Sequence, residues 1–148
     1  MKRSAKQIQL GIINGPNLNL LGKRQPELYG EESFDSFFST LKQKFPALGL
    51  HYFQSNHEGA IIDQIQRWSD ALDGMILNAA AYTHTSIAIA DALAALPVPV
   101  VEVHITDISQ REPFRRHSYL TPHCETTIMG KGLEGYALAI HFLLRRNV

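Results

Sequence analysis

Apolar and polar residues form blocks of two kinds along this chain. Five short blocks favour strands, of which 8–13 and 74–78 are mostly apolar, as in strands buried on both faces, while 48–54 alternates apolar with smaller or polar residues. We predict strands at 8–13, 48–54, 74–78, 98–105 and 126–129. The longer blocks between and after them favour helices, which we predict at 33–45, 55–68, 85–96 and 133–144.

The first predicted helix has the clearest pattern. Its apolar residues recur every three or four positions from Phe34 to Phe45, the spacing of a helix with one buried face. Ser33 is a suitable N-cap, and a proline follows the last apolar residue. In the second helix we expect Ser55 or Asn56 to provide the cap.

The alternation of strands and helices predicts an α/β fold. Five strands match a flavodoxin-like, doubly wound parallel sheet with strand order 2-1-3-4-5 and right-handed crossovers. We expect a single domain, 1–148, with a flexible N-terminal tail at 1–7. Ligands of such sheets bind beyond the carboxyl ends of the strands. We expect the loops after the first and fourth strands to be neighbours across the point where the strand order reverses.

A long polar loop, residues 14–30, follows the first strand. It contains three asparagines, two prolines, two basic residues and one tyrosine. A loop of this length in a compact domain usually binds or covers a ligand. We interpret residues 14–17 as a fixed turn and residues 20–29 as a lid.

Composition narrows the classes of partner. The 148 residues have a formal net charge of zero, from 14 basic and 14 acidic side chains, so we expect no nucleic-acid partner. No apolar run is long enough for a membrane span or for the core of a signal peptide, so we expect no membrane partner. The single cysteine, Cys124, excludes an internal disulfide and suits a reducing compartment. These features indicate a soluble, cytoplasmic protein.

Two glycine-containing segments resemble nucleotide-binding loops but have the wrong spacing. Six residues separate Gly15 from Gly22, where a phosphate-binding P-loop has four, and Arg24 follows Lys23 where the P-loop has Ser or Thr. The glycine cluster at 130–135 precedes the last helix, whereas a dinucleotide-binding fingerprint follows the first strand. We therefore expect no nucleotide cofactor.

Metal and nucleophilic chemistry are also weakly supported. His117, His123 and Cys124 are the only cluster of soft ligands, and a structural zinc site needs four. Cys124 has no fixed partner, and no Gly-x-Ser-x-Gly segment is present. We expect no metal, and solvated histidines around a buried thiol are the simpler interpretation.

General acid–base chemistry has better candidates. His104 ends an apolar strand, and Glu102 lies two residues earlier, on the same face of that strand. The carboxylate is therefore placed to orient the imidazole. Tyr29 and Arg24 form a second pair in the predicted lid. Arg111 is a candidate for a second cation, since one arginine is marginal for stabilising a phenolate.

Five motifs, in this order along the chain, resemble those of the type II 3-dehydroquinate dehydratases, and the resemblance covers about residues 8–144. They are Asn14-Gly-Pro-Asn-Leu-Asn-Leu-Leu-Gly with Arg24 and Tyr29-Gly30, Phe53-Gln-Ser-Asn-His-Glu-Gly59, Asn78 with Ala81-Tyr-Thr-His-Thr85, Val101-Glu-Val-His104, and Arg111-Glu-Pro-Phe-Arg-Arg-His-Ser-Tyr119.

The resemblance implies a hydro-lyase that converts 3-dehydroquinate to 3-dehydroshikimate, in the shikimate pathway or in quinate breakdown, without a cofactor or metal. It also implies a homo-oligomer, a dodecamer built as a tetramer of trimers. Asp91 would then reach the site of a neighbouring subunit. The alternative is a catalytically silent, flavodoxin-like protein that binds a small carboxylate, against which the intact Tyr29, Arg24 and His104 argue.

Matching motif positions imply five roles in the reaction. Tyr29 would remove a proton beside the ketone, and Arg24 would favour its phenolate. Asn17 would hold a water that stabilises the enolate. His104 would protonate the departing hydroxyl while Glu102 orients it. This is an anti elimination, which needs a base and an acid on opposite faces of a ring.

The resemblance also implies how the substrate is held. Asn78 and the backbone at Ile105 and Thr106 would grip the carboxylate. His84 and Arg115 would bind the ring hydroxyls.

Two positions depart from the pattern of the family. Ala79-Ala80 follows the strand-three asparagine where Gly or Pro-Gly is frequent, and Asp107 stands where Asn is common. We expect the methyl groups to narrow the carboxylate pocket slightly and Asp107 to add a negative charge near the site. Both changes would tune affinity without loss of function.

Overall fold

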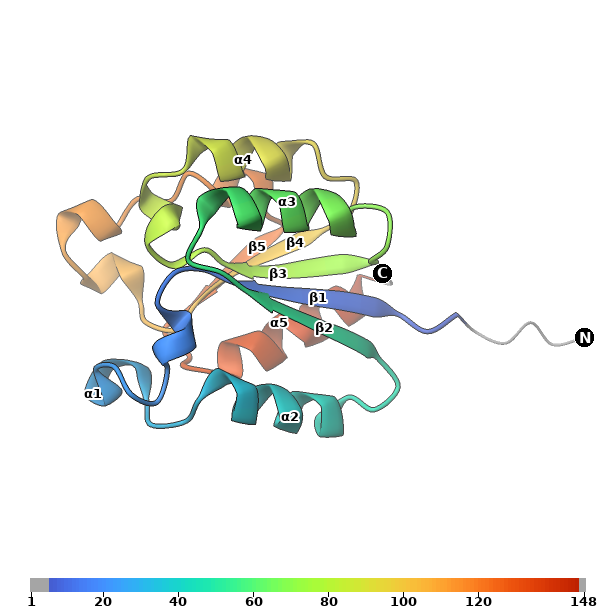
Figure 1. The fold of residues 1–148 in the computed structure, drawn as a ribbon, viewed down its shortest axis with the longest axis horizontal. Helices are drawn as coiled ribbons and strands as arrows, with labels where there is room; N and C mark the ends of the chain where they lie inside the picture. Colours follow the sequence, from blue (N-terminus) through green and yellow to red (C-terminus); the bar gives the residue numbers. More distant parts are fainter. Residues whose placement is uncertain (1–5, 147–148) are drawn as a thin grey trace, which may run out of the picture.

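The computed structural model describes residues 6–146, which form a five-stranded parallel sheet in the order β2-β1-β3-β4-β5 (Figure 1). The predicted fold and strand order are therefore confirmed. The strands are β1 (Gln9–Asn14), β2 (Gly49–Gln54), β3 (Gly74–Asn78), β4 (Val100–His104) and β5 (Thr126–Met129). The helices are α1 (Pro26–Tyr29), α2 (Phe34–Lys44), α3 (Glu58–Trp68), α4 (Ile87–Ala94) and α5 (Glu134–Arg145).

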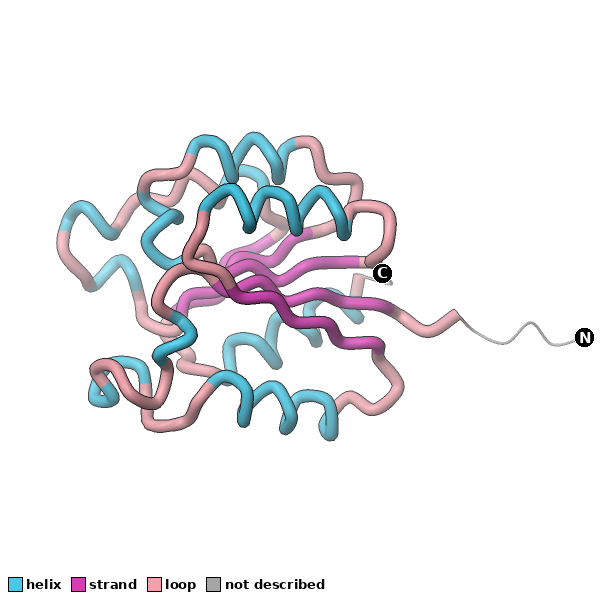
Figure 2. Tube along the Cα trace, viewed as in Figure 1, coloured by secondary structure: helices cyan, strands magenta, loops and turns pink. Residues whose placement is uncertain are grey.

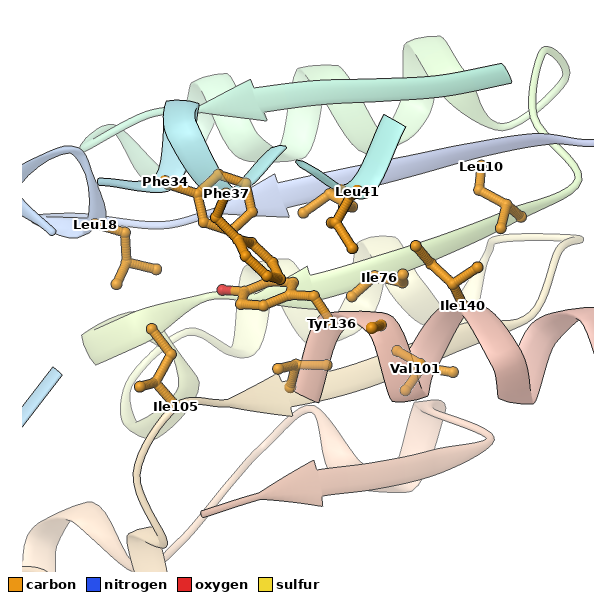
Figure 3. Close-up of a cluster of buried hydrophobic side chains, with 14 of the residues drawn as sticks. Leu10, Leu18, Phe34, Phe37, Leu41, Ile76, Val101, Ile105, Tyr136 and Ile140 are labelled. Carbon is orange, nitrogen blue, oxygen red and sulfur yellow. The ribbon is translucent and has the colours of Figure 1, made fainter. Parts of the chain in front are cut away.

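Helices cover both faces of the sheet. Helices α3 and α4 lie on one face, and α2 and α5 lie on the other (Figures 1 and 2). Because successive side chains of a strand point to opposite faces, Ile12 and Ile13 of β1 join different cores. Ile12 packs in the cluster that includes Phe34 of α2 and Tyr136 of α5, part of which Figure 3 shows. Of the predicted tail, residues 1–5 lie outside the described part, and residues 6 and 7 have no regular structure.

The second helix begins later than the sequence suggests. It starts at Glu58, and neither predicted cap occupies the capping position. The Ser55 hydroxyl accepts a hydrogen bond from the backbone N–H of His57 at 2.9 Å, and the Asn56 side chain accepts one from that of Asn17, also at 2.9 Å. Ser55 is therefore engaged within the connection between β2 and α3, and Asn56 joins that connection to the turn after β1. The first helix is capped as predicted, because Ser33 accepts from the backbone of Ser36.

The two long loops contain short helical turns that the pattern of apolar residues did not predict. The loop at 14–30 holds the four-residue helix α1, which buries none of its residues and so leaves no apolar stripe in the sequence. The segment 106–124 holds three 3₁₀ turns, each three residues long. Both loops lie at the carboxyl ends of the strands, on the left in Figure 1.

The strand order corrects one expectation about the site. Strand β3 lies between β1 and β4, so the loops after the first and fourth strands are not immediate neighbours. The strand order reverses between β1 and β3. The residues that follow β1, β3 and β4 therefore surround the same opening. Within residues 6–146, no helix has the length and apolar character needed to cross a membrane.

Candidate active site

A cavity of about 150 Å³ opens at the carboxyl ends of β1, β3 and β4. Glu102 and Asp91 do not line it. The other predicted site residues do, and they are Asn17, Arg24, Tyr29, Asn78, His84, His104, Ile105, Thr106, Arg111 and Arg115. Chain topology thus brings together side chains from the loop after β1, from strand ends and from the segment after β4.

The turn after β1 is held against the end of β3. The backbone N–H of Gly15 donates to the carbonyl of Asn78 at 2.8 Å. A Cβ atom on Gly15 would collide with the backbone carbonyl of Ala79, so this close approach requires glycine. Asn17 has a φ of 69°, in the left-handed region, and its N–H is bonded to Asn56. These contacts support the interpretation of residues 14–17 as a fixed turn.

The Tyr29 phenol is bonded to an arginine that lies far away in the sequence. Nη1 of Arg111 donates to the phenol oxygen at 3.0 Å. The guanidinium carbon of Arg24 lies 6.0 Å from the centre of the Tyr29 ring, and that of Arg111 lies 5.9 Å away. Both predicted cations therefore lie beside the ring, but Arg111, rather than Arg24, makes the hydrogen bond.

His104 and Glu102 form the expected pair. Nε2 of His104 lies 2.7 Å from Oε2 of Glu102, and both side chains are almost fully buried. Glu102 lies behind the imidazole and is separated from the cavity by it. His104 therefore keeps its other ring nitrogen for proton exchange with a ligand.

Three hydroxyl groups that sequence reasoning missed surround the Glu102 carboxylate. Ser118 donates to Oε2 at 2.6 Å, and Thr121 and Thr127 donate to Oε1 at 2.6 and 3.0 Å. Burial alone would raise the pKa of Glu102, but the hydrogen bond and charge of His104, together with the bonds from Ser118 and Thr121, outweigh it and lower the pKa to about 2. The carboxylate is therefore ionised at neutral pH. Ser118 belongs to the fifth motif of the family resemblance, which gave it no role, and Thr127 is the register partner of Glu102 on β5.

His84 presents a hydrogen-bond acceptor at its free ring nitrogen. Its Nδ1 lies 2.7 Å from the backbone carbonyl of His117, which only accepts, so Nδ1 carries the proton. Burial lowers the pKa of His84, and the nearby His104 and Arg115 lower it further, so the ring is neutral at pH 7. Nε2 is therefore an acceptor, which suits a ligand hydroxyl.

The Asn78 side chain is held by two hydrogen bonds at the end of β3. Its Oδ1 accepts from the backbone N–H of Ala80 at 3.1 Å, and its Nδ2 donates to the Tyr136 hydroxyl at 3.0 Å. That hydroxyl donates in turn to Oδ1 of Asn14 at 2.7 Å. Sequence reasoning gave no role to Tyr136, because it lies 58 residues beyond Asn78, in the last helix.

Both departures from the family pattern have a structural consequence. Ala80 lines the cavity and has a φ of 52°, a backbone conformation that suits glycine better than alanine. Asp107 does not line the cavity, because its carboxylate caps the 3₁₀ turn Ile108–Gln110 by accepting from the backbone and hydroxyl of Ser109.

The surroundings of Asp91, Arg115 and Cys124 differ from one another. Asp91 is exposed on α4, outside the cavity of its own chain. Arg115 lines the cavity, and its Nε lies 3.0 Å from Oε2 of Glu112. Burial and the nearby Glu102 and Glu125 raise the pKa of Cys124 to about 12, which leaves a protonated, unreactive thiol. Among residues 6–146, no group of three or more His, Cys, Asp or Glu side chains is arranged to hold a metal ion.

Comparison with known proteins places this geometry in a family. The model of the family described as dehydroquinase class II matches residues 8–144. A 3-dehydroquinate dehydratase of Cereibacter sphaeroides is 48% identical over 135 residues, covering 87% of this chain and 89% of that protein. A catabolic 3-dehydroquinase of Verticillium alfalfae is 46% identical over 136 residues, covering 90% and 91% of the two chains.

Solved structures agree with the sequence comparisons. The crystal structure of a type II dehydroquinase from Butyrivibrio crossotus has a TM-score of 0.90 and 42% identity, and covers 93% of this chain and 98% of that one. The type II dehydroquinase from Propionibacterium acnes has a TM-score of 0.88 and 38% identity over the same shares of the two chains. This chain therefore belongs to the class II dehydroquinase family.

Proposed function

We propose that this chain is a hydro-lyase that removes water from 3-dehydroquinate and forms 3-dehydroshikimate by anti elimination through an enolate. The names of its relatives support the reaction. One observation carries the assignment of roles. A phenol with an arginine partner and an imidazole with a carboxylate partner line the same cavity.

Tyr29 is the base in this proposal. Its oxygen accepts a hydrogen bond from Arg111, and Arg24 lies beside the ring, so both cations are placed to stabilise negative charge that develops on the oxygen. The phenolate takes the proton beside the ketone, and the electron pair of the broken C–H bond forms an enolate. Asn17, at the end of the fixed turn, lines the same cavity and is placed to hold a water against the enolate oxygen.

His104 is the acid that completes the elimination. The imidazolium gives its proton to the departing hydroxyl, which leaves as water while the enolate collapses to the conjugated ketone. Glu102 stabilises the imidazolium, because the carboxylate is ionised and 2.7 Å away. The hydroxyls of Ser118 and Thr121 hold the carboxylate in place, so the imidazole has a fixed orientation.

The remaining lining residues bind the substrate. Asn78 and the backbone at Ile105 and Thr106 bind the carboxylate. The neutral His84 accepts a hydrogen bond from a ring hydroxyl at Nε2, and Arg115 donates to another. These groups lie around the opening between the ends of β1, β3 and β4, and so they fix the ring between the phenol and the imidazole.

We also propose that the chain works as a dodecamer, a tetramer of trimers, in which Asp91 contributes to the site of a neighbour. Asp91 is exposed on α4, and Ile87, one turn earlier on the same helix, is 59% exposed. An exposed isoleucine beside an exposed carboxylate suits a surface that another subunit covers. Sedimentation of the purified protein tests this, since an active monomer would contradict the role of Asp91.

The absorbance of the conjugated product tests the reaction. Purified protein should generate it from 3-dehydroquinate, at a rate proportional to protein concentration. The competing function is a catalytically silent protein that binds a small carboxylate. Binding of 3-dehydroquinate without any conjugated product would favour that alternative and refute the enzyme.

A further inference from the structure

A chain of buried polar groups lies at the inner end of the cavity and connects β3, α5 and β1. It runs from the backbone N–H of Ala80 to Oδ1 of Asn78, from Nδ2 of Asn78 to the Tyr136 oxygen, and from the Tyr136 hydroxyl to Oδ1 of Asn14. Asn14 and Tyr136 are fully buried, and Asn78 is 3% exposed. Figure 3 shows the Tyr136 oxygen pointing toward the end of the sheet where Leu18 and Ile105 lie.

The donor and acceptor types of these groups fix the direction of each hydrogen bond in this row of polar groups. The N–H of Ala80 is a backbone donor, so the side-chain atom of Asn78 that faces it must be the oxygen. The amide nitrogen of Asn78 then faces Tyr136 and donates to it. The Tyr136 hydroxyl, having accepted that bond, has its own proton free for Asn14. Burial raises the pKa of Tyr136, so the hydroxyl keeps this proton.

Asn78 is left with one unused group. An amide nitrogen carries two protons, and only one is bonded to Tyr136. Asn78 also lines the cavity, so the second N–H is available to a ligand there. The side chain can present only a donor, because its oxygen is occupied by Ala80.

The Tyr136 hydroxyl is not needed to fill the core. Its ring packs edge-on against Phe34 with centroids 4.9 Å apart and is tilted against Phe37 at 6.2 Å, and a phenylalanine would keep both contacts. Gly135 allows helix α5 to approach the sheet, since a Cβ atom there would lie 3.3 Å from Val103. The glycine before Tyr136 thus lets the phenol reach the strand ends. This gives a local purpose to part of the glycine cluster that sequence reasoning left unassigned.

We propose that Tyr136 is a positioning residue, whose hydroxyl holds the Asn78 amide so that one N–H faces the substrate carboxylate. The inference rests on the proposed function, because it takes the carboxylate of 3-dehydroquinate as the ligand of that N–H. Tyr136 itself touches neither the substrate nor the reacting atoms. Its effect therefore falls on substrate binding, and the proton transfers at Tyr29 and His104 are left intact.

The test is Tyr136→Phe, assayed by product absorbance over a range of 3-dehydroquinate concentrations. The substitution removes one of the two hydrogen bonds that hold the Asn78 amide. We expect KM to rise roughly 10-fold and kcat to stay within about threefold of the wild-type value. In a chain that already carries Asn78→Ala, the same substitution should raise KM no further. The proposal would be overturned by a KM equal to that of the wild type, or by a fall in kcat as large as the rise in KM. Additive effects of Tyr136→Phe and Asn78→Ala on KM would also overturn it.

Tyr52→Phe is the matched control. It removes a phenol hydroxyl from the same aromatic cluster, where the Tyr52 ring lies 4.6 Å from that of Phe34. Its hydroxyl lies 3.5 Å from Nδ2 of Asn14, and it makes no hydrogen bond with Asn78. KM should therefore stay near the wild-type value, and a rise equal to that of Tyr136→Phe would mean that the effect is one of packing alone.

A second measurement needs no variant and so does not depend on its folding. It is a crystal structure of the wild-type protein with quinate, a carboxylate that lacks the ketone. We expect Nδ2 of Asn78 within hydrogen-bond distance of both the Tyr136 oxygen and the quinate carboxylate. An Asn78 side chain that leaves Tyr136 to meet the carboxylate would overturn the proposal. The wild-type assay separates the two claims. Absence of turnover in the wild type refutes the proposed function. Turnover in the wild type, with an unchanged KM in Tyr136→Phe, refutes only the role of Tyr136.

Discussion

Arg111→Met removes the cation that is hydrogen-bonded to the proposed base. The bond from Nη1 to the Tyr29 oxygen is 3.0 Å long, and the Arg111 side chain is 18% exposed. Two unit charges at this distance interact by about 5.5 kcal/mol at an effective dielectric of 20, an upper bound. A hydrogen bond to a charged group contributes about 1.5–3 kcal/mol net, which is the better guide for a partly exposed pair. A loss of about 2–3 kcal/mol corresponds to a fall in kcat/KM of roughly 30- to 150-fold.

The assay is product absorbance across a range of pH. Without Arg111, the oxygen of Tyr29 loses its hydrogen-bond donor as negative charge develops on it, so kcat/KM of the variant should be lower than that of the wild type at every pH tested. Arg67→Met is the matched control, because Arg67 lies on α3 and donates to Gln64, away from the cavity. If Arg111→Met and Arg67→Met have the same kcat/KM, Arg111 does not support the base.

Two further predictions concern stability. The pKa of Glu102 is lowered from 4.5 to about 2 in the folded chain, so the unfolded chain takes up a proton first as the pH falls. The carboxylate therefore stabilises the fold above pH 4.5, and this stabilisation is lost as the pH falls toward 2. Urea unfolding should therefore show Glu102→Gln to be less stable than the wild type at pH 7 by about 3 kcal/mol, with a smaller difference at pH 3, and an equal difference at both pH values would contradict this. Ala80→Gly should raise the free energy of unfolding by about 0.5–1 kcal/mol, because the left-handed backbone at this position would no longer carry a Cβ atom. Thermal denaturation measures this, and a variant less stable than the wild type would show that Ala80 is not strained.

The sequence predicts best those features that depend on residues close together in the chain. The two-residue period of a strand places Glu102 and His104 on one face, and the structure brings them within 2.7 Å. The three- and four-residue spacing of apolar side chains predicts α2 together with its Ser33 cap. Alternation of strands and helices was enough to predict the order of the sheet, and with it the end of the sheet where the cavity lies.

Contacts between distant residues were harder to predict. Arg24 is near Tyr29 in the sequence and was the first choice as its partner, but the hydrogen bond comes from Arg111, 82 residues away. The hydroxyls around Glu102 come from the loop after β4 and from β5, which no periodicity connects to that residue. Tyr136 follows the pattern of an ordinary core aromatic residue, and only the folded chain places its hydroxyl between two asparagines. Such contacts depend on how elements pack, which local spacing does not encode.

The central claim is that the Tyr29 phenolate removes the proton from 3-dehydroquinate. Tyr29→Phe tests it most directly, because the substitution deletes only the phenol oxygen of a side chain on α1, a helix that buries none of its residues. We expect product formation to fall by roughly 10³-fold, with the melting temperature close to that of the wild type. A variant that still forms product at a rate near that of the wild type would show that another group is the base and would contradict the account.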